Sequence, residues 1–475
     1  MTTSRRLVSN TLVVVIGGAA QRLLHFVTTI VLARGLGEEE FGTYAFVVAY
    51  MFIFGFIVDL GFERVITREI SRQPERAGEL IGTGFVIRGV LSLLAATVAV
   101  VVAWLLNLPA LTQLCILLTA IGLPLSIEIL VRGFFQSRFE MHYTYLLTLP
   151  GQIVFVASAA VVISLGGRLP AVFVSALITG VLTVALILWV ALPKMAVVWR
   201  PDPILLRYLW RESWELGAVI LLFLISMRID QVLLYWLRGT ADVGQYAVAV
   251  KVTEALSLIP ESVMVTLFPL LAATERSAPE RFQQIYRVTV RYLIALVLPI
   301  ALLLTLERAQ IIRVLYGAAY AEGATALALL AWWMFFSFTG AVYINLMVVN
   351  RQQRVMAVVS AAAVALNLLL NLLWIPRWGA TGAAAATLVS GASSFVLFSV
   401  VPQTQAILRV CCREAIRPLI AIAATAVGVR LLMTPSAQAV AVVPLYVVLL
   451  VTLGGVDRHD WAWVGEVWHP TQPRR

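Results

Sequence analysis

Four basic side chains fall inside apolar stretches of this sequence, where a charge has little water around it. They are Arg22 and His25, spaced i and i+3 on one helix face, and the more distant Arg228 and Lys251. An ionised group within hydrocarbon costs about 2.5–3.5 kcal/mol or more, so each is a candidate for function. Because guanidinium and ammonium groups make charge-assisted hydrogen bonds to phosphate oxygens, these cations predict a site for an anionic, phosphate-bearing ligand.

Acidic side chains also fall within apolar stretches, and they define a second candidate set. A buried carboxylate can titrate, so it can couple a process to a proton or sodium gradient, or act as a gate. The members of this set are Asp59, Glu128, Asp230, Glu254 and Glu261.

A purely structural alternative remains open for both sets. Lys251 would then pair with Glu254, and Arg228 with Asp230 or a neighbouring helix, so that the charges only neutralise one another. For Asp59, hydrogen bonds from Arg64 or Arg68 would have the same effect.

The elements that must position these residues are membrane-spanning helices. The chain has 475 residues, of which 61% are hydrophobic and 13% charged, whereas soluble domains are roughly 45–50% apolar and about 25% charged. Fourteen apolar spans can be placed, each near the roughly 20 residues that cross a bilayer. They lie near 7–33, 41–63, 82–106, 109–131, 142–165, 170–192, 213–237, 244–271, 288–306, 323–349, 353–374, 380–401, 418–432 and 438–454.

The short connections between these spans leave no room for a large soluble catalytic domain, so we do not expect an enzyme. The three cysteines and four scattered histidines argue against a disulfide framework and a zinc site, and we expect no metal or other cofactor.

Basic residues in the connections predict the orientation. If both termini are cytoplasmic, most of the 35 lysines and arginines lie on the cytoplasmic side, as the positive-inside rule requires. The net charge of +10 therefore reflects topology rather than nucleic-acid binding. We expect a multi-pass protein of the cytoplasmic (inner) membrane.

An internal repeat predicts the domain organisation. The segment RGLGEEEFGTYAFV begins at Arg34 and RGTADVGQYAVA begins at Arg238; both contain Arg-Gly followed by Gly-x-Tyr-Ala. The offset from Gly42 to Gly244 also places Asp59 on Glu261, and Arg88 falls beside Arg291. Six spans per copy is an even number, so the copies are parallel repeats. The predicted lobes are residues 1–200 and 201–410, followed by 411–475 with two further spans and a cytoplasmic tail.

One connection is unusually rich in arginine. Arg64, Arg68, Arg72 and Arg76 recur every four residues and would share one helix face, provided that Pro74 does not break the helix. This face either attracts anionic headgroups or is an ordinary positive-inside anchor.

The sequence resembles the polysaccharide flippases of the MOP superfamily, which are Wzx-like exporters related to MurJ and to MATE drug exporters. The resemblance rests on the fourteen spans, the opening NTLVVVIGGAAQRLLHFVTTIVLARGLGEEEFGTYAF from Asn10, DLGFE at Asp59 to Glu63, and IPRWGATGAAAATLVS from Ile375. It implies an all-α integral membrane protein with two six-helix lobes around a central cavity, plus two C-terminal helices.

The resemblance also implies a function. A flippase of this kind would move a polyprenyl-diphosphate-linked oligosaccharide across the membrane by alternating access, driven by an ion gradient. Its partners would be the lipid-linked oligosaccharide, membrane lipids, and polysaccharide polymerase and glycosyltransferases. In MurJ-like members, cations of the first and eighth helices line the cavity, which matches Arg22 and Lys251. The alternative is a MATE-like exporter of small molecules, for which acidic and aromatic linings are expected instead.

Overall fold

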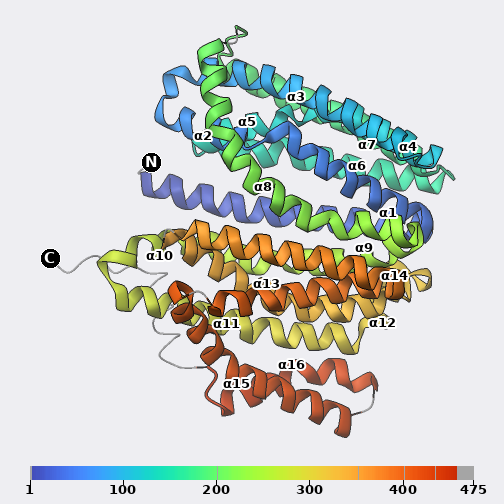
Figure 1. Ribbon diagram of the computed structural model, residues 1–475, viewed down its shortest axis with the longest axis vertical. Helices are drawn as coiled ribbons and strands as arrows, with labels where there is room; N and C mark the ends of the chain where they lie inside the picture. The colour runs from blue at the N-terminus through green and yellow to red at the C-terminus, as the bar shows by residue number, and fades with distance from the viewer. Residues whose placement is uncertain (1–2, 201, 351, 401, 434, 457–475) are drawn as a thin grey trace. The chain divides into compact units, whose positions relative to one another are not determined.

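The computed structural model describes residues 3–200, 202–350, 352–400, 402–433 and 435–456, and these residues are almost entirely helical (Figure 1). They form two compact units. The first comprises Met1–Ala255, Leu315–Gly323 and Leu368–Ala383, and the second comprises Leu256–Val314, Ala324–Asn367 and Ala384–Arg475. The predicted all-α membrane fold is confirmed. The predicted lobes, residues 1–200 and 201–410, were defined by the repeat and not by compact units. Their boundaries stay a prediction.

The helices of the N-terminal part are long because the sequence is apolar over whole spans. They are α1 (Thr3–Asp59), α2 (Phe62–Arg72), η1 (Pro74–Arg76), α3 (Ala77–Leu105), α4 (Ala110–Gly122), η2 (Leu123–Ile127), α5 (Glu128–Ser137), α6 (Met141–Ser164), α7 (Leu169–Met195), α8 (Pro203–Arg238) and α9 (Thr240–Leu256). Within this unit α1 packs on α6 and α8, α6 on α7, and α3 on α4.

The remaining helices follow the same pattern. They are α10 (Leu258–Ser277), α11 (Pro279–Leu306), α12 (Arg308–Tyr316), η3 (Ala318–Tyr320), α13 (Gly323–Val349), α14 (Gln353–Val400), α15 (Pro402–Leu432) and α16 (Pro435–Thr452). In the second unit α11 packs on α10, α15 and α16, and α15 packs on α16.

The predicted spans correspond closely to these helices. Nine stretches of the described residues are long and apolar enough to cross a membrane. Two of them, Val13–Arg72 and Arg354–Phe398, each contain two predicted spans, because α1 and α14 continue across bends at Gly37 and Gly379, where φ is positive. Three further predicted spans fall on α8, α15 and α16.

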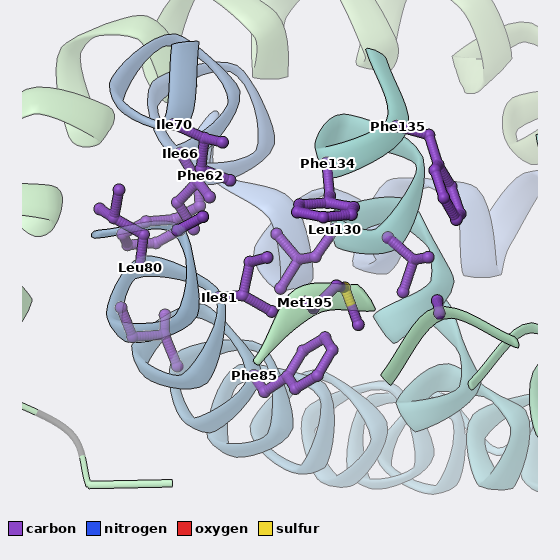
Figure 2. Close-up of a cluster of buried hydrophobic side chains, with 14 of the residues drawn as sticks. Phe62, Ile66, Ile70, Leu80, Ile81, Phe85, Leu130, Phe134, Phe135 and Met195 are labelled. Carbon is purple, nitrogen blue, oxygen red and sulfur yellow. The ribbon is translucent and has the colours of Figure 1, made fainter. Parts of the chain in front are cut away.

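The short helix α2 is held in place by its apolar face. Its buried residues meet α3, α5 and the end of α7 in one cluster (Figure 2). The labelled members are Phe62, Ile66, Ile70, Leu80, Ile81, Phe85, Leu130, Phe134, Phe135 and Met195.

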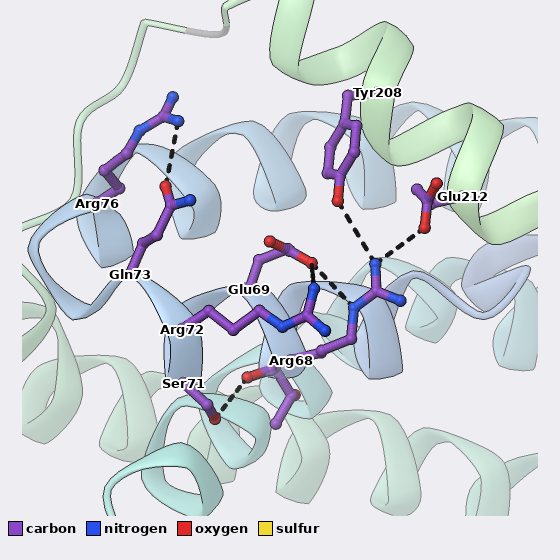
Figure 3. A network of polar contacts seen from close by, with 9 residues as sticks. Arg68, Glu69, Ser71, Arg72, Gln73, Arg76, Tyr208 and Glu212 are labelled. Carbon is purple, nitrogen blue, oxygen red and sulfur yellow. Dashed lines mark hydrogen bonds and ion pairs between the residues drawn. The ribbon is translucent and has the colours of Figure 1, made fainter.

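The arginine-rich connection is divided at Pro74. Helix α2 ends at Arg72, and Pro74 begins the separate turn η1, so Arg76 does not continue the α2 face. Arg68 donates to Glu212 at 3.0 Å and to Glu69 at 2.9 Å, and its terminal nitrogen also meets Tyr208 (Figure 3). Because Tyr208 and Glu212 belong to α8, Arg68 ties α2 to the first turns of that helix.

The two copies of the repeat meet at their glycines. A Cβ on Gly42 of α1 would overlap the carbonyl oxygen of Thr240, and one on Gly244 of α9 would lie 2.5 Å from that of Glu38. Thr240 stands at the repeat position of Glu38, just as Gly244 stands at that of Gly42. The contact is therefore reciprocal, as expected where equivalent surfaces meet about a twofold axis.

This crossing gives a prediction about stability. Gly42→Ala forces two backbones apart, and overpacking of this kind costs about 1–3 kcal/mol. Gly55→Ala is the matched control, since a Cβ at this position of the same helix would have nothing within 4 Å, and alanine favours a helix over glycine. Thermal unfolding in detergent should show a lower midpoint for Gly42→Ala alone. Equal midpoints for the two variants would contradict the tight crossing.

Candidate functional site

The centre of the candidate site is a carboxylate shared by two cations. Glu254 of α9 accepts a hydrogen bond from Lys251 Nζ at 2.7 Å through Oε2, and its Oε1 lies 3.0 Å from Arg228 Nη1 of α8. The exposed fractions of the side chains are 15% for Arg228, 31% for Lys251 and 40% for Glu254. The predicted pairing of Lys251 with Glu254 is present. Of the two partners expected for Arg228, the structure has the neighbouring helix, through Glu254 of α9, rather than Asp230.

Arg228, Lys251 and Glu254 are called the triad below. Further side chains of the same unit surround this triad. The guanidinium of Arg228 lies 5.4 Å from the ring centre of Phe52 on α1, a favourable cation–π distance. His25, also on α1, lies within electrostatic range of Lys251 and Glu254, and its Nε2 is 3.3 Å from Gln152 Nε2 of α6. The structure therefore brings His25, Arg228, Lys251 and Glu254 together from three helices.

Arg22 lies on the same helix face as His25, one turn earlier. Its charge acts on Tyr145 of α6, and the hydroxyl of that tyrosine is 3.7 Å from where a Cβ on Gly18 would stand. Gly18 and Arg22 thus lie beside α6. The role of Arg22 in binding stays a prediction.

Asp230 takes its hydrogen bonds from other groups than the cations, although its charge lies within electrostatic range of Arg228. It is buried and accepts hydrogen bonds from Tyr246 Oη of α9 and, at 2.8 Å, from the backbone nitrogen of Gln231. These bonds connect α8 to α9 close to the triad. Its hydrogen bonds fit a positioning role, and its predicted part in coupling stays a prediction.

Asp59 has a different partner from the expected one. Arg88 Nη1 of α3 lies 2.9 Å from Asp59 Oδ1, and Arg88 Nε donates to Ser126 Oγ at 3.3 Å. The side chain of Arg88 is only 4% exposed. The prediction that Arg64 or Arg68 donates to Asp59 is therefore wrong. Asp59 lies in the last turn of α1, and the packing of α3 on α1 brings a cation distant in sequence closer than the neighbouring arginines.

Glu128 lines a largely apolar cavity that carries a few polar side chains. Glu128 is the first residue of α5 and lines a cavity of about 500 Å³ bounded by α1, α4, α6 and α7. Polar side chains on its wall include Gln21, Thr148, Gln152 and Thr183. The cavity was not predicted, although the amides and hydroxyls within apolar spans were a usable signal.

Glu261 is in the first turn of α10 and belongs to the second unit, so its predicted part in coupling stays a prediction. Among the described residues, no group of three or more His, Cys, Asp or Glu side chains is arranged to hold a metal ion.

The geometry of the triad predicts that substitutions of Glu254 and Lys251 lower the thermal stability by different amounts. Glu254→Gln removes the charge that both cations share, leaving them in a poorly hydrated place, whereas Lys251→Gln leaves Arg228 paired. Removing one partner of a buried pair costs up to about 3–5 kcal/mol, and partial exposure here reduces this. Thermal midpoints in detergent should fall further for Glu254→Gln than for Lys251→Gln; the reverse order would contradict the shared-carboxylate geometry.

The fold is similar to that of solved membrane transporters. A structure titled "Lipid II flippase MurJ, inward closed conformation" matches with a TM-score of 0.74 at 11% identity, covering 94% of this chain and 99% of that one. An inward-facing multidrug resistance MATE family transporter of the MOP superfamily matches with a TM-score of 0.65 at 14% identity, covering 83% and 96%. The Vibrio cholerae MATE transporter VcmN matches with 0.59 at 15%, covering 85% and 97%.

These likenesses show the fold, and no curated protein sequence matches this chain. The helical architecture and the apolar spans define a multi-pass membrane protein. Residues 7–275, more than half of the chain, match the family described as "Polysaccharide biosynthesis protein". The chain belongs to this family, as the resemblance to MOP superfamily flippases predicted.

Proposed function

We propose that this protein is a flippase that translocates a polyprenyl-diphosphate-linked oligosaccharide across the cytoplasmic membrane by alternating access. The observation that carries the proposal is the triad, in which two cations, Arg228 and Lys251, share the single carboxylate of Glu254. Such a group has a net positive charge and attracts an anion. The family match and the MurJ-like fold support a lipid-linked substrate.

The triad also supplies a physical mechanism for binding and release. In the empty site Glu254 neutralises part of the charge of both cations, which lowers the cost of keeping them away from bulk water. An entering diphosphate offers several oxygens at once, and it displaces the carboxylate from Arg228 Nη1 and Lys251 Nζ. On release, Glu254 takes the cations back. The exchange keeps both cations paired in both states, and the displaced carboxylate of Glu254, whose side chain is 40% exposed, is left to hydration.

The remaining parts of the proposal concern orientation and partners. Both termini lie in the cytoplasm, in agreement with the distribution of basic residues, and the diphosphate enters with its prenyl chain in the lipid. Arg22 and His25 continue the cationic wall along α1. Glycosyltransferases would supply the substrate, and a polysaccharide polymerase would consume it.

Substitution of the triad cations tests this function. In a strain lacking the chromosomal gene, Lys251→Gln and Arg228→Gln should lower export about 10- to 100-fold, since a hydrogen bond to a charged group contributes about 1.5–3 kcal/mol. Lys251→Arg keeps the charge and should retain most activity. Lipid-linked oligosaccharide and surface polysaccharide are quantified together, and accumulation of the first with loss of the second is expected.

Arg313→Gln is the matched control, because this arginine is exposed on α12. Membrane levels of every variant are measured by immunoblot. Undiminished surface polysaccharide in both triad variants would contradict the assignment. Unchanged glycan with new sensitivity to cationic drugs would favour the MATE-like exporter, in which Glu128 and Glu254 would bind the cationic substrate.

Glu128 is our candidate for coupling to an ion gradient. Its carboxylate faces a cavity that also carries amide and hydroxyl oxygens, the ligand types that suit a proton relay or a hard monovalent cation. Asp59 has a buried ionic partner and is less suited to this role.

Coupling through Glu128 predicts a selective loss. In membrane vesicles loaded with lipid-linked oligosaccharide, Glu128→Gln should make export independent of an imposed proton or sodium gradient. Its export rate should equal the rate that the unaltered protein shows without a gradient. Glu140→Gln, a carboxylate just before α6 that does not line the cavity, should keep the response to the gradient. A full response in Glu128→Gln would remove Glu128 from the coupling mechanism.

A further inference from the structure

The second unit contains a cluster of arginines that lies apart from the triad. Glu414 of α15 accepts from Arg287 Nε at 2.5 Å and from Arg291 Nε at 2.6 Å, and both arginines belong to α11. The side chain of Glu414 is 7% exposed and that of Arg291 10%, whereas Arg287 is 47% exposed. One buried carboxylate therefore fixes two guanidinium groups from the neighbouring helix.

Two more arginines of α15 complete the cluster. Arg413 and Arg417 line the same small cavity of about 90 Å³ as Arg287, Arg291 and Glu414. Arg417 Nη1 also donates to the carbonyl oxygen of Gly454 at 2.5 Å, which ties α15 to the residues that follow α16. The cavity adjoins a wider one of about 550 Å³, whose wall includes Glu280, Gln283 and Gln284 of α11.

The charge of this cluster is unbalanced. Four arginines face one glutamate in the inner cavity, and the outer cavity adds one further carboxylate, Glu280. Burial raises the pKa of Glu414, but the bonds from Arg291 and Arg287 more than offset this and hold it below its usual value. Glu414 is therefore ionised at neutral pH, and the cluster still has an excess of positive charge.

The surface next to the cluster is apolar. Ile416, Leu419 and Ile420 continue α15 beyond Arg413 with exposed fractions of 55%, 41% and 52%. In a membrane protein such a surface contacts acyl chains. The cluster belongs to the connections predicted to be cytoplasmic, so its cations lie at the depth of lipid headgroups, with the apolar part of α15 continuing toward the hydrocarbon.

From this arrangement we infer that α11 and α15 form a binding site for the phosphate-ester headgroup of an anionic phospholipid. The phosphate oxygens accept from the terminal nitrogens of Arg287 and from Arg413, and the acyl chains lie along Leu419 and Ile420. Glu414 is a positioning residue, since it holds Arg287 and Arg291 at the cavity through their Nε atoms. An ordinary positive-inside anchor needs neither the buried carboxylate nor the cavity.

The test uses the purified full chain in neutral detergent, with native mass spectrometry to count bound lipid. The probes are phosphatidylglycerol, phosphatidylcholine and inorganic phosphate. We expect the unaltered chain to retain phosphatidylglycerol in preference to phosphatidylcholine. Arg287→Gln/Arg413→Gln should bind phosphatidylglycerol about 30-fold more weakly, and Arg413→Gln alone about 5-fold, since each basic residue near the headgroups contributes similarly.

The matched control is Arg207→Gln/Arg211→Gln, which removes two exposed arginines of α8 from another predicted cytoplasmic connection, and it should retain the lipid. The single variant Arg413→Gln should fold normally, because the side chain of Arg413 is exposed and is not part of the Glu414 ion pairs. Weaker binding by this variant therefore cannot be attributed to misfolding. Equal retention by the cluster variants and the unaltered chain would overturn the site. The thermal unfolding midpoint is also measured with each probe added. Equal protection from unfolding by inorganic phosphate and by phosphatidylglycerol would overturn the lipid assignment. The assay does not involve export, so its result is independent of the proposed function.

Discussion

An ionised side chain surrounded by hydrocarbon is costly unless an opposite charge or a hydrogen-bond donor meets it. This constraint organises the polar residues of the chain. Asp59 is met by Arg88, Asp230 by Tyr246, Glu254 by Arg228 and Lys251, and Glu414 by Arg287 and Arg291. Each of these pairs joins side chains of two helices, except the bond from Lys251 to Glu254. The same energy that neutralises a charge therefore also fixes how two helices pack.

The repeat shows how this constraint can be met in two ways. Arg88 and Arg291 occupy nearly equivalent positions in the two copies. Arg88 takes its partner, Asp59, from the same copy, whereas Arg291 takes Glu414 from α15, which follows the repeat. At Gly42 and Gly244 the copies remain alike, because two backbones in close contact leave no space for a side chain. In the predicted repeat, the same residue type therefore occurs where the two backbones touch, whereas the two arginines have different ionic partners.

The sequence was sufficient to predict the spans and much of the triad, for reasons that are local. Apolar length sets the number of crossings, and the i, i+3 spacing of Lys251 and Glu254 places them on one face of a helix. The partner of Asp59 was not predictable in this way. Arg64 and Arg68 are nearer along the chain, but the packing of α3 on α1 decides that Arg88 is nearer in space. The cavity at Glu128 depends on five helices at once, and no periodicity along one helix describes it.

A difference in charge balance separates structural ion pairs from sites that can bind a ligand. Asp59 and Arg88 match one to one, so an incoming anion or cation would gain little and would leave a charge unpaired. At Glu254 two cations share one carboxylate, and at Glu414 four arginines surround one. At these proposed sites a bound anion would offset the excess positive charge and would keep the cations paired if it displaced the carboxylate. Both proposed anion-binding sites therefore rest on an excess of cations over local carboxylates, rather than on the presence of a charge within a span.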